Sequence, residues 1–118
     1  MNTVTLNQER FQLQDIPTRL NDLATHLDQI RSLVLTDTDS DKIVSLMRES
    51  RYYIEWIVPQ FVDIDVDSSA ELVDLGRVLT RWLFNWEKIW VDNIERTAVA
   101  QIAGSLSERV REVSSLVS

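Results

Sequence analysis

Three tryptophans recur at four-residue intervals in the second half of this 118-residue chain, at Trp82, Trp86 and Trp90. On an α-helix this spacing stacks the three indoles along one side, about one turn apart. Side chains of this size imply a substantial apolar core, an interface that buries them, or both. The tryptophan row therefore predicts a helix here, and it is more informative about packing than about chemistry.

Glycine and proline are scarce, with two of each in the whole sequence. Folds built from β-strands need many more turn residues, so this scarcity favours a few long helices. Hydrophobic residues make up 44% and charged residues 26%, which is typical of a globular domain. We expect a single domain over residues 1–118 that buries its own core.

The chain is acidic, with a formal net charge of −7. Binding to nucleic acid or to an anionic membrane needs clustered positive charge, so we expect neither partner. The sequence has no cysteine, which excludes disulfides and thiolate chemistry. Its apolar runs are too short to span a bilayer, and its first ten residues lack the apolar core of a signal peptide. We therefore expect a cytoplasmic protein.

The apolar pattern predicts four helices. The first covers residues 16–35, where apolar residues follow the 4-3-4-3-4 spacing of a helix packed along its length. The second covers residues 40–61, and Pro59 should end it early or bend it. The third follows a capping box formed by Ser68 and Glu71.

The end of the third helix has two interpretations. A break at Asp92 or Asn93 would start a fourth helix, whereas an unbroken helix over residues 69–104 would favour an intertwined dimer. Residues 1–14 form either a short helix or an extended arm. We favour the break, and the fold class is then all-α: an antiparallel up-down four-helix bundle with a short N-terminal arm.

Tyr52 and Trp56 are the main indication of function on the second helix. They lie with Arg48 opposite the apolar stripe of this helix, on its nominal solvent side. Exposed aromatic side chains beside arginine are typical of interface hot spots. The alternative is that the N-terminal segment covers this side of the helix.

A second apolar row on the third helix consists of Val73, Phe84 and Val91, and it is separate from the tryptophan row. The third helix is therefore too apolar for one neighbour. Either it is the central helix of the bundle, or it pairs with a second copy of the chain.

Acidic residues are the candidates for catalysis or metal binding. Aspartates alternate in both polar connections, but neither connection has the glycine and glutamate of an EF-hand loop. We interpret these aspartates as helix caps, at positions Asp37, Asp39, Asp41, Asp63, Asp65 and Asp67.

Two single residues are weaker candidates. Glu87 lies on a flank where a desolvated carboxylate would have a raised pKa, as a general acid needs, although pairing with a basic side chain explains it more simply. His26 is the only histidine and lies beside the apolar seam of the first helix, where we expect a structural role. The sequence therefore predicts no catalytic residue, metal site or cofactor.

We favour a protein that acts by protein–protein association, as a homodimer, an adaptor or a regulator, because the apolar surface exceeds what a monomer needs. The alternative is a helical-bundle enzyme or ligand-binding protein that uses its acidic residues, with or without a metal ion.

Overall fold

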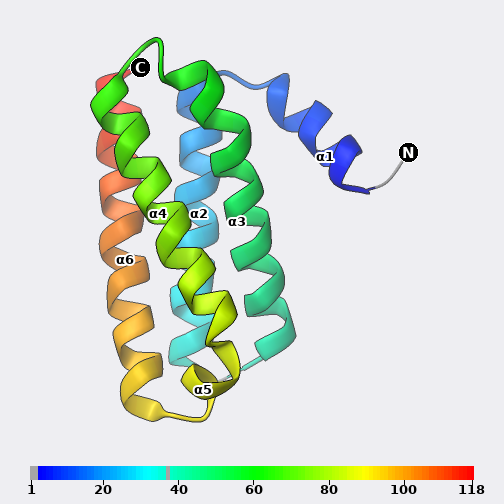
Figure 1. The fold of residues 1–118 in the computed structure, drawn as a ribbon, viewed down its shortest axis with the longest axis vertical. Coiled ribbons are helices and arrows are strands. Elements are labelled where there is room, and N and C mark those ends of the chain that lie inside the picture. Colours follow the sequence, from blue (N-terminus) through cyan, green and yellow to red (C-terminus); the bar gives the residue numbers. More distant parts are fainter. Residues whose placement is uncertain (1–2, 37) are drawn as a thin grey trace.

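The computed structural model describes residues 3–36 and 38–118, and every regular element in them is an α-helix. The all-α class is therefore confirmed. Four long helices lie side by side, α1 stands beside α3 at one edge, and the short α5 lies at one end (Figure 1). The helices are α1 (Thr3–Gln12), α2 (Ile16–Leu35), α3 (Ser40–Phe61), α4 (Val66–Phe84), α5 (Trp86–Trp90) and α6 (Asn93–Leu116).

Aspartates begin the four long helices. Each carboxylate accepts a hydrogen bond from a backbone N–H in the first turn, where these donors have no helical partner. The Asp15 carboxylate lies 2.8 Å from the Thr18 nitrogen, and the Asp65 carboxylate lies 3.1 Å from the Ser68 nitrogen. Asp39 and Asp92 cap α3 and α6 in the same way. Of the six aspartates that we interpreted as caps, Asp39 and Asp65 take the capping position, Asp41 and Asp67 lie in the first turn, and Asp63 lies in the turn before α4.

The predicted capping box at Ser68 is wrong, because Asp65 takes the capping position and α4 starts earlier. Ser68 instead lies inside the first turn, and its hydroxyl donates to the second carboxylate oxygen of Asp65 at 3.0 Å. Glu71 is therefore free to reach α6.

The third predicted helix is two helices in the structure. It is interrupted at Asn85, which has φ −106° and ψ 13° and whose side-chain amide donates to the Arg81 carbonyl. The predicted break at Asp92 is confirmed, and an unbroken helix over residues 69–104 is wrong. Pro59 does not end α3, which continues to Phe61.

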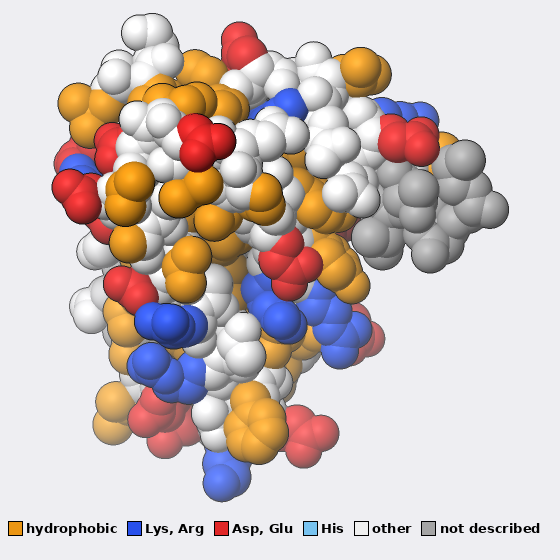
Figure 2. Space-filling model, turned by 45° about the horizontal axis from the view of Figure 1, so that its top comes forward, with side chains coloured by type: hydrophobic (Ala, Val, Ile, Leu, Met, Phe, Trp, Pro, Cys, Tyr) orange, Lys and Arg blue, Asp and Glu red, His pale blue; other side chains and the backbone are white. Residues whose placement is uncertain are grey.

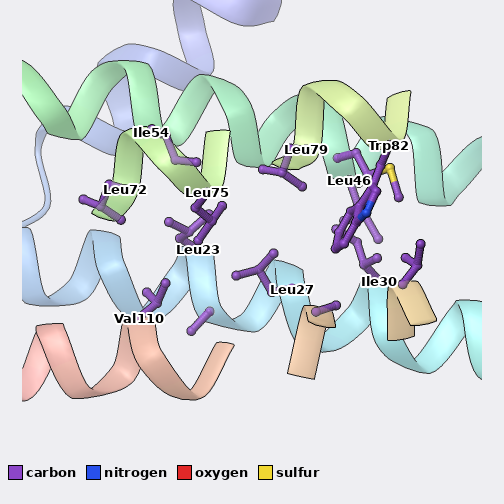
Figure 3. Packing of buried hydrophobic residues seen from close by; sticks show 14 of the residues in the cluster. Leu23, Leu27, Ile30, Leu46, Ile54, Leu72, Leu75, Leu79, Trp82 and Val110 are labelled. Atoms are coloured by element: carbon purple, nitrogen blue, oxygen red, sulfur yellow. The ribbon is translucent and has the colours of Figure 1, made fainter. Parts of the chain in front are cut away.

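The core lies between the long helices, and α2 supplies its centre. Leu20, Leu23, Leu27 and Ile30 are fully buried, as the 4-3-4-3-4 spacing predicts. Figure 3 shows Leu23 and Leu27 between α4 and α6, with Trp82 and Leu79 reaching in from α4.

The helix pair α2 and α6 packs most extensively. Small buried residues lie on both helices and let the two backbones approach, and the Ser107 hydroxyl donates to the Ala24 carbonyl at 3.1 Å. Gly104 does not break α6: a Cβ there would lie 3.1 Å from Arg31 Cδ, so the glycine makes room for that side chain.

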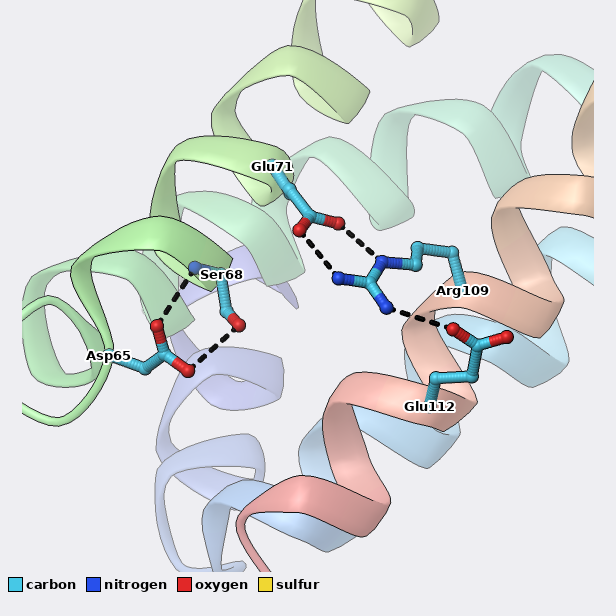
Figure 4. Close-up of polar contacts among 5 residues, drawn as sticks. All are labelled: Asp65, Ser68, Glu71, Arg109 and Glu112. Atoms are coloured by element: carbon cyan, nitrogen blue, oxygen red, sulfur yellow. Dashed lines mark hydrogen bonds and ion pairs between the residues drawn. The ribbon is translucent and has the colours of Figure 1, made fainter.

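An ion pair joins α4 to α6, which otherwise meet along a small part of their length. Arg109 donates from two nitrogens to the Glu71 carboxylate at 2.6 and 2.7 Å, and from the third to Glu112 at 2.8 Å (Figure 4). The bidentate bond lowers the pKa of Glu71.

Acid should therefore destabilise the fold. The pKa of Glu71 is lowered chiefly by the Arg109 bond, and that of Asp65 by its bonds from Ser68. A lowered folded-state pKa contributes stability above the unfolded value, about 4.3 for glutamate, and this contribution is lost as the pH falls through the folded value. We expect the free energy of unfolding to be level above about pH 5 and to fall below it.

Urea titrations between pH 3 and pH 7 measure this dependence. Glu71→Gln removes the carboxylate that Arg109 binds, so it should flatten part of the slope. Equal slopes in Glu71→Gln and the parent chain would show that this ion pair does not contribute to acid sensitivity.

Candidate association surface

Trp56 is buried rather than exposed, with 9% of its surface accessible. The N-terminal helix α1 covers it: the Phe11 ring stacks on Tyr53 at 4.3 Å and tilts against Trp56 at 5.5 Å. The expectation that Trp56 faces solvent is therefore wrong, and the alternative of a covering N-terminal segment is correct. Tyr52 stays 37% exposed and stacks on the Trp56 ring at 5.8 Å.

Arg19 fixes the connection between α1 and α2 against α3. Its buried guanidinium donates to the Gln14 carbonyl at 2.8 Å, the Gln12 carbonyl at 2.5 Å and the Gln60 side chain at 2.6 Å. It also lies over the Phe11 ring, 5.6 Å from its centre. Burial lowers the pKa of Arg19, and Asp15 opposes this effect. One arginine thus satisfies the carbonyls of the turn and holds α1 over Trp56.

The outer side of α4 carries a regular row of exposed residues that includes large apolar side chains. We call it the α4 outer row: Val66, Ala70, Val73, Arg77, Thr80 and Phe84, all exposed. Phe84 is 89% exposed and Val73 is 39% exposed, so the prediction of a second apolar row on this helix is confirmed for both. The spacing is 4-3-4-3-4, which is the spacing of a helix that packs along a neighbour.

A groove between α3 and α4 runs beside the α4 outer row. It has a volume of about 470 Å³ and a mostly apolar lining that includes Ile54, Val58 and Pro59 of α3 and Val73 and Gly76 of α4. A Cβ at Gly76 would lie 3.7 Å from Ile54, which is ordinary contact, so no close approach of the backbone requires this glycine. Its lack of a side chain leaves the floor of the groove open.

Basic side chains on the α3–α4 face gather toward one end. The end near α5 carries Arg48 and Arg51 of α3 and Arg77 and Arg81 of α4, together with one acid, Asp41, in the first turn of α3. The opposite half carries Glu55, Asp63, Asp67 and Asp74. Among the charged side chains visible in Figure 2, most Lys and Arg lie below the middle and most Asp and Glu lie above it, although some Asp and Glu are also present at the lower end. Arg77 and Asp74 meet at 3.0 Å near the boundary, and both are largely exposed.

Residues 66, 70, 77 and 80 of the α4 outer row were not among the predicted interface residues. Their spacing is present in the sequence. Val66 was missed because it precedes the predicted helix start at Ser69, whereas Ala70, Arg77 and Thr80 lie inside the predicted helix but are not large apolar residues.

The remaining interface candidates are exposed but scattered. Arg48 is exposed on α3. Val91 is exposed just after α5, one residue before the Asp92 cap of α6, so it does not belong to α4.

Glu87 and His26 do not form a catalytic pair. Glu87 is exposed, which excludes the less favoured alternative of a desolvated carboxylate. His26 is half-buried: one ring nitrogen lies 2.9 Å from the Asp22 carbonyl and the other 2.9 Å from the Glu49 carboxylate, and the ring edge meets Tyr53. This histidine joins α2 to α3, which agrees with a structural role.

Two findings on the described residues bear on metal binding and membrane insertion. No group of three or more His, Cys, Asp or Glu there is arranged to hold a metal ion, and Asp37 lies outside this part of the chain. Within the same residues, none of the helices combines the length and apolar character needed to cross a bilayer.

Comparison with known proteins adds no identification. No protein-family model, curated protein or solved structure matches this chain.

Proposed function

We propose that this protein acts by protein–protein association and forms a homodimer through the α4 outer row and the adjoining groove. Its subunit is an antiparallel up-down four-helix bundle built from α2, α3, α4 and α6, with α1 packed on one side. The observation that carries the proposal is the α4 outer row, because it exposes Val66, Val73 and Phe84 on a helix that is already packed on its other side.

A second copy is the simplest partner for such a surface. Isologous two-fold pairing lets one patch cover its own copy, and it is the commonest form of oligomer. The same face carries both charge signs, so it is compatible with itself in a way that a face of one sign is not. A row containing Val66, Val73 and Phe84 buries apolar area on pairing.

Light scattering coupled to size-exclusion chromatography tests the dimer directly. At micromolar concentrations we expect a mass about twice the 13.7 kDa of the subunit. Val73→Glu or Phe84→Glu should weaken association at least about tenfold, because a charge would be desolvated without a partner. Circular dichroism should be unchanged, since both side chains are exposed in the subunit.

Leu116→Glu is the matched control. Leu116 is a 70% exposed apolar residue on α6, outside the proposed surface, so the same charge there should leave the mass unchanged. A monomeric parent chain at these concentrations would refute the homodimer.

A further inference from the structure

We infer that the two copies pair antiparallel along α4, with the two-fold axis level with Leu75. This inference rests on the homodimer proposed above and specifies how the partner lies on that surface. It depends on two properties of the α4–α3 face: the symmetry of the outer row and the separation of charge.

The α4 outer row is symmetric about its centre. Val66 and Phe84 lie equally far from Leu75, as do Ala70 and Thr80, and Val73 and Arg77. In an antiparallel pair centred at Leu75, Val66 of one copy faces Phe84 of the other. Ala70 likewise faces Thr80, and Val73 faces Arg77. Val66 is covered by Phe84, the most exposed large apolar residue of the row.

Charge favours the same direction. The first half of α4 carries Asp67 and Asp74, and the second half carries Arg77 and Arg81. Antiparallel pairing places each basic half against an acidic half and brings two Asp74–Arg77 pairs together at the centre. Parallel pairing would place like charges opposite one another, which is unfavourable.

The helix dipole alone does not explain this separation. It favours acidic residues in the first turn and basic residues in the last, and α4 agrees with it. In α3 the first turn carries Asp41, as the dipole favours, but in the middle of the helix Arg48 and Arg51 come before Glu55, which is the reverse order. The start of α3 lies beside α5, where the Trp86 indole donates to Ser40 at 2.9 Å. In the middle of both α3 and α4, the basic residues therefore lie nearer to the α5 end than the acidic residues do.

Site-specific disulfides test the direction of pairing, because the parent chain has no cysteine of its own. Ala70→Cys and Thr80→Cys replace exposed residues by one of similar size and leave Val73 and Phe84 in place. In the antiparallel pair, position 70 faces position 80 of the other copy. Position 70 of one copy and position 70 of the other are then about 15 Å apart along the helix axis, because ten residues at 1.5 Å each separate them, and the same holds for position 80. This distance is beyond the limit of roughly 7 Å between Cα atoms that a disulfide can bridge.

Each variant is oxidised alone, and the two are also oxidised as an equimolar mixture in which one carries a tag that identifies the mixed disulfide. Light scattering of every sample reports separately whether a dimer is present. We expect the mixed disulfide in the mixture, at a yield at least about tenfold above either variant alone. Disulfides in each single variant would overturn the inference in favour of parallel pairing, with the homodimer intact. A dimer without disulfides in any sample would show that α4 is not the interface. A monomeric parent chain would refute the proposed function and this inference together.

Discussion

Replacing Trp86 with alanine should lower the free energy of unfolding by about 3–5 kcal/mol, the range for truncating a buried large aromatic side chain. The indole is buried where α4, α5 and the start of α3 meet, and its Nε1–H donates to the Ser40 hydroxyl at 2.9 Å. It also packs against Trp90, with 5.6 Å between ring centres. Its removal leaves a cavity at the turn where the chain passes from α4 to α5.

Two variants separate the packing from the hydrogen bond. Trp86→Phe keeps most of the apolar bulk and removes the donor, and Ser40→Ala removes the acceptor; each should cost far less, with the hydrogen bond itself contributing about 1 kcal/mol. Urea unfolding followed by circular dichroism measures all three. A near-neutral Trp86→Ala would contradict the assignment of this tryptophan to the core.

Local signals in the sequence were sufficient to predict the all-α class and the bounds of several helices. The bounds of α2 and α3 are those predicted, because a regular apolar stripe and an aspartate cap coincide at each start. The start of α6 at Asn93 follows from Asp92 for the same reason. These elements are determined by residues close to one another in the chain.

The interruption at Asn85 was not predicted, since the tryptophan row continues through it without a glycine or proline. Trp82 and Trp86 are both buried on the two sides of the interruption, so the apolar pattern alone does not distinguish one helix from two. The short α5 is stabilised by a contact distant in sequence, the bond from Trp86 to Ser40. A pattern within one segment carries no information about such a partner.

The candidate surface was predicted in part. Val73 and Phe84 are exposed as expected, because a helical wheel places them away from the tryptophan row. Trp56 was placed wrongly, since its burial depends on Phe11 of α1. The position of α1 depends in turn on Arg19, whose contacts span from Gln12 to Gln60.

Arg19→Ala should therefore release α1 and expose Trp56. The change removes three hydrogen bonds from a buried charged donor, each contributing about 1.5–3 kcal/mol in favourable cases, so we expect a loss of at least about 3 kcal/mol. The Gln12 and Gln14 carbonyls would lose this donor. Hydrogen exchange measured by mass spectrometry should show protection lost in α1 first, with α6 still protected.

Arg10→Ala is the control, because Arg10 lies on the same helix with an exposed side chain. It should leave exchange in α1 unchanged, whereas full protection of α1 in Arg19→Ala would show that the Phe11 contacts hold the helix without the arginine.

Release of α1 also bears on association. It would uncover Trp56 beside Tyr52, and the new apolar surface should raise non-specific aggregation while leaving the α4 outer row intact. A released α1 together with an unchanged dimer mass would therefore separate the role of α1 in covering the core from the role of α4 in pairing.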